Sequence, residues 1–180
     1  VLGNFWWECA GQTAPADFNV DLTMNRMDIF GTGSSEIRLN AANGNHTRTW
    51  TINGEYTQNG GIVNLSSSNN GIGKINFKGS NFYGLMTITE SSSNNGKGII
   101  EFCGSQPQLA YFGNLNNTID IVINTADRVL LNTPLTINPG ATLTLTTGKV
   151  VTTAAYLLTI TNGATVVGGN VSSHILGPMR

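Results

Sequence analysis

The acidic side chains are the first candidates for chemistry in this chain of 180 residues. They are Glu8, Asp17, Asp21, Asp28, Glu36, Glu55, Glu90, Glu101, Asp120 and Asp127. Glycoside hydrolysis requires two carboxylates held across one bond, yet no two of these residues are neighbours or separated by only one or two positions. We therefore predict no catalytic residues and no enzyme. A carbohydrate-active lyase or hydrolase stays the alternative, with a pair such as Glu55 and Glu101 converging from separate parts of the chain.

The histidines and cysteines do not form a recognisable reactive or metal-binding set. His46 and His174 have no nucleophile or acid at an informative spacing, and no histidine lies at ligand spacing from Cys9 or Cys103. We predict no metal and no cofactor. A single Cys9–Cys103 bridge and two isolated thiols both remain open, and the thiols are the favoured interpretation, with Cys103 facing outward beside Glu101.

Aromatic residues offer the strongest binding signal. Stacking faces for a glycan could come from Tyr56, Tyr83, Tyr111 and Tyr156, beside the hydrogen-bonding groups of Asn and Thr, while core filling is the alternative for each. A second group, Phe5, Trp6 and Trp7, is a candidate for self-association.

Composition excludes several classes of function. Only 11% of residues are charged, the formal net charge is −1, and Lys and Arg are scattered, so a surface for nucleic acid is not expected. No apolar run approaches the roughly 18 residues of a membrane span. The 22 glycines and many Asn, Ser and Thr residues are typical of a turn-rich, secreted β-protein.

Internal repeats indicate the fold. SSSNNGIGKINFKGS at 66–80 returns as SSSNNGKGIIEFCGS at 91–105, a period of 25, and LTINPGATLTL at 135–145 returns as LTITNGATVVG at 158–168, a period of 23. Short alternating β-branched segments separated by Asn-Gly and Gly-Gly turns predict strands throughout. A fixed period of this size predicts a solenoid, in which each repeat buries its apolar face against its neighbours.

We therefore predict an all-β, right-handed parallel β-helix with coils of about 23–25 residues, the hand being that of the commonest β-helix class. Equivalent residues should lie above one another, with Ile75 under Ile100 and Phe77 under Phe102 as core rows. Asn69 with Asn94, and Asn70 with Asn95, should form amide ladders at the turns.

The repeats also predict the domain organisation. Residues 1–30 read as an N-terminal cap or junction and 31–180 as solenoid repeats, with an irregular coil around 105–133. Open coil ends are strand edges, so the expected partners are neighbouring modules or identical subunits associating end to end, with surface glycans as further partners.

Several segments resemble the repetitive regions of large surface proteins from Bacteroidetes that use the type IX secretion system. The resemblance is carried by INGEYTQNGGIVNL, MTITESSSNNGKGIIEFCGS, NTPLTINPGATLTLTTGKV and GGNVSSHILGPMR. It implies a cell-surface or secreted, adhesin-like solenoid that is a segment of a larger protein. No C-terminal sorting domain accompanies it in the sequence.

The function expected from these observations is a structural or adhesive extracellular module or a fibre-forming subunit. Carbohydrate binding or cleavage is the alternative. Ice binding is a minor alternative based on the Thr-x-Thr pairs. A period of 23 places Thr142 on Thr165 but Thr144 on Val167, which interrupts the threonine array that ice binding requires.

Overall fold

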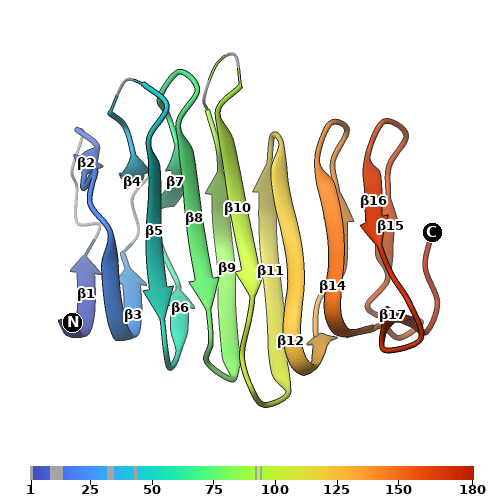
Figure 1. Cartoon of the computed structure of the whole chain (residues 1–180). Helices are drawn as coiled ribbons and strands as arrows, with labels where there is room; N and C mark the ends of the chain where they lie inside the picture. The colour runs from blue at the N-terminus through green and yellow to red at the C-terminus, as the bar shows by residue number, and fades with distance from the viewer. Residues whose placement is uncertain (1, 9–13, 32–34, 43, 92, 94) are drawn as a thin grey trace.

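A computed structural model of the chain describes residues 2–8, 14–31, 35–42, 44–91, 93 and 95–180. Its regular elements are all β-strands, and the ladders between them are parallel. The strands stack on successive turns of a solenoid, which confirms the fold predicted from the repeats (Figure 1). In the described part of the chain no helix has the length and apolar character needed to cross a bilayer.

Each turn of the solenoid contributes strands to three faces. The first face contains the start of β3 (Leu22–Phe30), β5 (Thr47–Ile52), β8 (Ile72–Phe77), β10 (Lys97–Phe102), the starts of β12 (Ile119–Leu131) and β14 (Thr142–Val151), and β16 (Thr165–Gly168). The second face contains β1 (Leu2–Glu8), the end of β3, β6 (Tyr56–Gln58), the starts of β9 (Asn81–Thr89) and β11 (Gln108–Asn116), the ends of β12 and β14, and β17 (Ser173–Leu176). The third face contains β2 (Ala16–Asp17), β4 (Glu36–Asn40), β7 (Ile62–Ser66), the ends of β9 and β11, β13 (Leu135–Ile137) and β15 (Leu158–Ile160).

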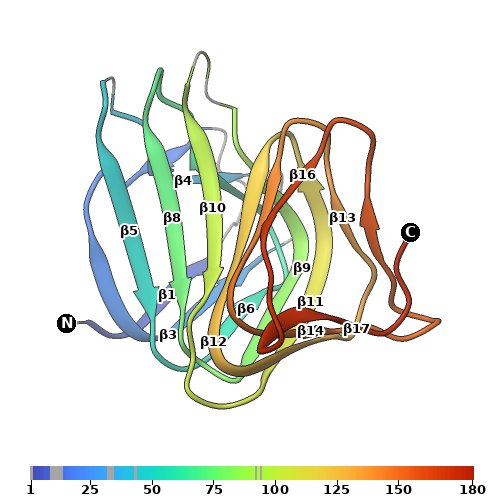
Figure 2. The same ribbon diagram turned by 45° about the vertical axis from the view of Figure 1, so that its right-hand side comes forward.

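The winding is right-handed. In Figure 1 the chain runs down the near face through β5, β8 and β10, and returns upward behind it through β9 and β11, while it advances from left to right. Figure 2 separates these two faces and shows the third side between them. The predicted hand is therefore confirmed.

Equivalent residues of the repeats lie in register, as the period of 25 predicts. Trp50 is paired with Ile75 and Ile75 with Ile100, and both steps span 25 residues. The next step, from Ile100 to Ile121, spans only 21 residues, and an earlier one, from Leu22 to Trp50, spans 28. Turns at the corners absorb these differences, so the inward rows stay aligned while coil length varies.

A chain of aromatic rings fills the middle of the core. The rings of Phe77 and Phe102 are 5.8 Å apart, and Phe82 lies 5.4 Å from Phe77 and 5.5 Å from Phe102. Their edge-to-face arrangement is the favoured one for buried aromatic pairs. Lys74, Asn76 and the other alternate positions of the same strands face outward, which explains why the repeat tolerates changes there.

At the N-terminal end, residues of the first segment join the same stack. β1 is parallel to β3 from Leu2 to Glu8, and the ring of Phe5 lies 5.4 Å from that of Phe18 and 5.8 Å from that of Trp50. These rings cover the first turn of the core.

The predicted Asn contacts fall in the turn between the third and first faces. The backbone amide of Asn95 donates to Oδ1 of Asn70 at 3.2 Å, so this pair is a side-chain-to-backbone contact between turns rather than an amide-to-amide ladder. Asn94 lies outside the described residues.

Candidate functional site

The structure separates the four tyrosines that the sequence offers as a glycan platform. Tyr56 is fully buried, its ring stacks on that of Phe82 at 4.5 Å, and burial raises the pKa of its hydroxyl above the usual range. Its hydroxyl donates to Oε1 of Gln58 at 3.1 Å. The prediction that Tyr56 contacts a ligand is therefore wrong, because its register with Phe82 turns it into the core.

The other tyrosines lie on the outside but do not form one platform. Tyr83 and Tyr111 are in register on β9 and β11 of the second face, with ring centroids 4.9 Å apart and planes inclined by 31°. Such a pair covers part of each ring with the other ring. Tyr156 is exposed in the segment between β14 and β15, away from that pair.

The three N-terminal aromatic residues alternate in orientation along β1. Phe5 and Trp7 are half-buried against the core, whereas Trp6 faces solvent with 63% of its surface exposed. In register with Trp6 are Asp28 and then Thr57, so its row continues outside the second face.

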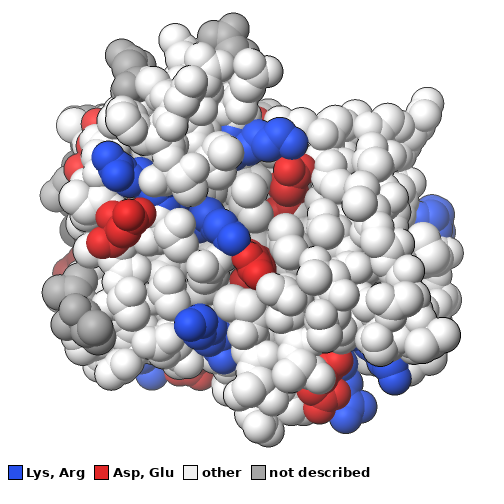
Figure 3. Space-filling view, viewed as in Figure 1, with Lys and Arg blue, Asp and Glu red and all other residues white. Residues whose placement is uncertain are grey.

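The carboxylates proposed as an enzymatic pair lie apart and are engaged. Glu55, at the corner after β5, accepts from Arg26 at 3.0 Å and from Asn81 at 3.4 Å. Glu101 lies on the first face, where Lys74 and Asn124 donate to it. Figure 3 shows cations and anions in alternation across this face, while coloured side chains over its C-terminal third lie only towards the margin.

The cysteines and histidines stay separate from one another in the described chain. Cys103 is a free, half-exposed thiol whose pKa is raised by burial and by the nearby Glu101 carboxylate. Cys9 lies outside the described residues. His174 is in register with Lys149 at the C-terminal end, and His46 lies in the turn before β5. No group of three His, Cys, Asp or Glu residues that could hold a metal occurs in the described ranges.

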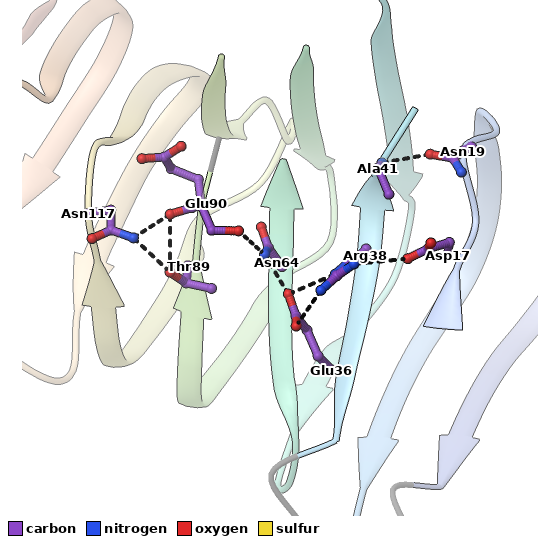
Figure 4. A network of polar contacts seen from close by, with 10 residues as sticks. Asp17, Asn19, Glu36, Arg38, Ala41, Asn64, Thr89, Glu90 and Asn117 are labelled. Carbon is purple, nitrogen blue, oxygen red and sulfur yellow. Dashed lines mark hydrogen bonds and ion pairs between the residues drawn. The ribbon is translucent and has the colours of Figure 1, made fainter. Parts of the chain in front are cut away.

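A connected network of polar side chains covers the third face (Figure 4). Arg38 contacts Glu36 at 3.1 Å and Asp17 at 3.8 Å. Nδ2 of Asn64 donates to Oε1 of Glu36 at 2.5 Å and to Oγ of Ser91 at 2.7 Å. The network thus links the N-terminal turns to the corner at Ser91 through groups that satisfy one another.

Beyond this network the sheet of the third face is interrupted. The end of β11 pairs with β9, whereas β13 pairs with β15 in a separate two-stranded sheet. Pro134 precedes β13 and has no N–H to donate to a neighbouring strand. Nδ2 of Asn138 bridges the gap by donating to the carbonyl oxygens of Leu115 at 2.8 Å and Asn117 at 3.1 Å.

The interruption produces the principal hollow on the described surface. A depression of about 730 Å³ is lined by Glu90, Ser91, Asn117, Thr118, Asn138 and Pro139. A second hollow of about 270 Å³ lies between β11 and residues 134–138 and shares Asn138 with the first. We call the two together the polar notch.

The groups in the polar notch are suited to hydrogen bonding more than to proton transfer. Glu90 is only 4% exposed, and it accepts from the backbone N of Thr118 at 3.2 Å and from its hydroxyl at 2.7 Å. The Asn117 amide nitrogen points towards Glu90 and Thr89, and its oxygen lies on the opposite side (Figure 4). Neutral amide and hydroxyl groups dominate the lining, with one carboxylate held in place behind them.

Neither a family model, a curated protein nor a solved structure matches this chain. Its function must therefore be argued from the residues and their arrangement.

The polar notch is the part of the surface that sequence reasoning missed. Its signal was present as the interval of 36 residues between Gly104 and Gly140, which contains Pro134 and Pro139 and breaks the repeat period. The interval indicates an irregular coil. It does not show that the irregularity opens the third face beside Glu90.

Proposed function

We propose that this chain is a structural module of a secreted or cell-surface protein, a rigid solenoid segment that spaces or joins adhesive parts. The observation that carries this proposal is the inward row that runs from Trp50 through Ile75, Ile100, Ile121 and Leu143 in consecutive strands. Because each turn is held by the turns on both sides, the module transmits position along its axis without a hinge.

The surface chemistry supports a structural role. The acidic side chains of Asp28, Glu101 and Asp120 are engaged by Arg26, Lys74 and Lys97. A carboxylate engaged in this way is a poor general base or nucleophile, since its charge is already neutralised. The register pairs Thr144 with Val167, which gives ice binding no regular threonine array.

The extracellular and adhesin-like part of the proposal is supported by composition and by the resemblance to Bacteroidetes surface proteins that use type IX secretion. Neutral Asn, Ser and Thr side chains supply most of the surface polarity, in a chain with only 11% charged residues. Its partners are neighbouring modules or identical subunits, which stack on the strand edges at either end of the solenoid.

Rigidity is tested by spin labels placed on one outward row. Thr23 and Val167 belong to the row that passes through Thr51, Asn76 and Glu101, and six strand steps of about 4.8 Å separate them by roughly 30 Å. We expect pulsed electron resonance of a Thr23→Cys, Val167→Cys protein, with the native cysteines changed to serine, to give one narrow distance near that value. A broad or bimodal distribution would contradict a spacer role.

Glycan binding at the polar notch is the second candidate function. The notch combines a depression of about 730 Å³ with amide and hydroxyl groups, which suit the hydroxyls of a neutral oligosaccharide. The aromatic platform expected from the tyrosines does not support this role, because Tyr56 is buried and Tyr83 stacks on Tyr111.

Binding of an oligosaccharide array to wild type, to Asn117→Ala and to Asn162→Ala tests this candidate. Asn162 is an exposed turn residue outside the notch, so it is the matched control. Glycan binding requires a signal that only Asn117→Ala lowers. Release of new reducing ends from any polysaccharide in the array would instead favour an enzyme.

A further inference from the structure

Charge is distributed unevenly along the solenoid axis, although the chain as a whole carries only −1. Residues 1–40 contain five acidic and two basic residues, a formal charge of −3. Residues 128–180 contain Arg128, Lys149 and Arg180 and no acidic residue, a formal charge of +3. Sequence position follows the solenoid axis, so the two ends carry opposite charge (Figure 1).

Apolar side chains are exposed at the positive end. Val166, Val167, Leu176 and Met179 are each between 43% and 52% exposed on the last strands and the segment after them, and Val171 between those strands is 94% exposed. Earlier turns bury the positions equivalent to Val166, as Ile121 and Leu143 show. The last turn therefore presents a surface that another turn would cover.

The strands at both ends have one edge without a partner in the described chain. β1 pairs with β3 only, and β16 and β17 both pair with β14 only. All run in the direction of their neighbours, so a strand added at either end would continue a parallel sheet.

Register specifies which residues would meet. One outward row of the second face passes from Asn4 and Arg26 at the first turn to Leu130, Val151 and Leu176 at the last. A copy that continues this row would place its Asn4 beside Leu176. Its Phe5, Trp6 and Trp7 would then lie beside Gly177, Pro178 and Met179.

We propose that a second copy of this chain is the partner at these ends, and that copies stack head to tail with β1 of one copy added beside β17 of the next. This inference rests on the proposed structural function and names its partner. The opposite charges of the ends favour this pairing and disfavour contacts between like ends. Apolar contacts of Trp6 and Trp7 with Pro178 and Met179 supply the short-range attraction.

Charge reversal at each end gives a test that surface mutations elsewhere would not mimic. One variant carries Glu8→Lys and Asp17→Lys, and the other carries Lys149→Glu and Arg180→Glu. In either variant alone both ends have the same sign, so we expect self-association at low salt to weaken about tenfold or more. Mixing the two restores opposite signs at every contact, and we expect association of the mixture to return to the wild-type level.

Sedimentation velocity over a series of protein and salt concentrations measures these outcomes. Lys78→Glu, an exposed change outside both end regions, is the control for the single Arg180→Glu change and should leave association unaltered. The proposal is overturned if the wild type is a monomer throughout, or if the two reversed proteins fail to rescue each other. Either result leaves the rigidity measurement, and with it the spacer role, untouched.

Discussion

Phe77 and Phe102 lie 25 positions apart in the chain, yet their strands are parallel neighbours and their ring centroids are 5.8 Å apart at an interplanar angle of 76°. Both side chains are fully buried, and each also contacts Phe82 across the corner of the solenoid. One repeated letter in the sequence therefore corresponds to one continuous row in the core.

Truncation of Phe102 should destabilise the whole stack. Phe102→Ala removes a ring that contacts three others, and we expect the free energy of unfolding to fall by about 3–5 kcal/mol in urea denaturation. Phe102→Leu keeps most of the volume and should lose less than half as much. Equal losses for both variants would show that the ring does not fill a packed core.

Close approach of successive turns explains the glycine at every 25th position. A Cβ added to Gly79 would lie 1.2 Å from the carbonyl oxygen of Gly54, one turn earlier. We expect Gly79→Ala to unfold the protein or to lower its melting temperature strongly. Gly3→Ala is the matched control, because a Cβ there has no atom within 4 Å. A Gly79→Ala protein as stable as that control would contradict the observed spacing of the turns.

The sequence contained enough information for the stack and its inward rows. Ile75 with Ile100, and Phe77 with Phe102, follow from a shared period and a shared alternation, both of which are local properties of the chain. Positions such as Lys74 and Ile99 differ because they face outward, as strand alternation predicts.

The orientation of residues near corners could not be predicted in the same way. Tyr56 follows the turn at 53–55, and its inward orientation depends on how many residues that turn uses. Register steps that range from 21 to 28 residues show that corners vary while the faces do not. The polar notch likewise depends on Pro134 and Asn138 meeting β11 across space, which no repeat encodes.

Asn138 should be a structural residue of the notch as well as part of its lining. Its amide nitrogen donates to the carbonyl oxygens of Leu115 and Asn117 where the strands do not pair. Asn138→Ala leaves those carbonyls without this donor, and we expect a loss of about 1–3 kcal/mol in the free energy of unfolding. Asn162→Ala, on an exposed turn, should change it little. Hydrogen exchange would show faster exchange in β13 and β15 in the Asn138 variant alone.

The pair of Lys74 and Glu101 should give the first face a measurable pH dependence. Burial of Glu101 opposes its ionisation, but hydrogen bonds from Lys74 and Asn124 and the charge of Lys74 outweigh it and hold the pKa of Glu101 below its ordinary 4.5. A carboxyl whose pKa is lowered by folding stabilises the protein above its unfolded pKa. That stabilisation disappears as the pH falls through the folded value.

Removal of the cation should therefore matter at neutral pH and not in acid. We expect Lys74→Met to lower the free energy of unfolding by up to about 1 kcal/mol at neutral pH, because the pair is only partly buried. The difference from wild type should vanish well below pH 4.5, where Glu101 is protonated in both proteins. Lys78→Met, which removes an exposed lysine from the turn after the same strand, should give no such convergence. A Lys74→Met penalty that is the same at both pH values would mean that Lys74 acts through the packing of its aliphatic chain and not through its charge.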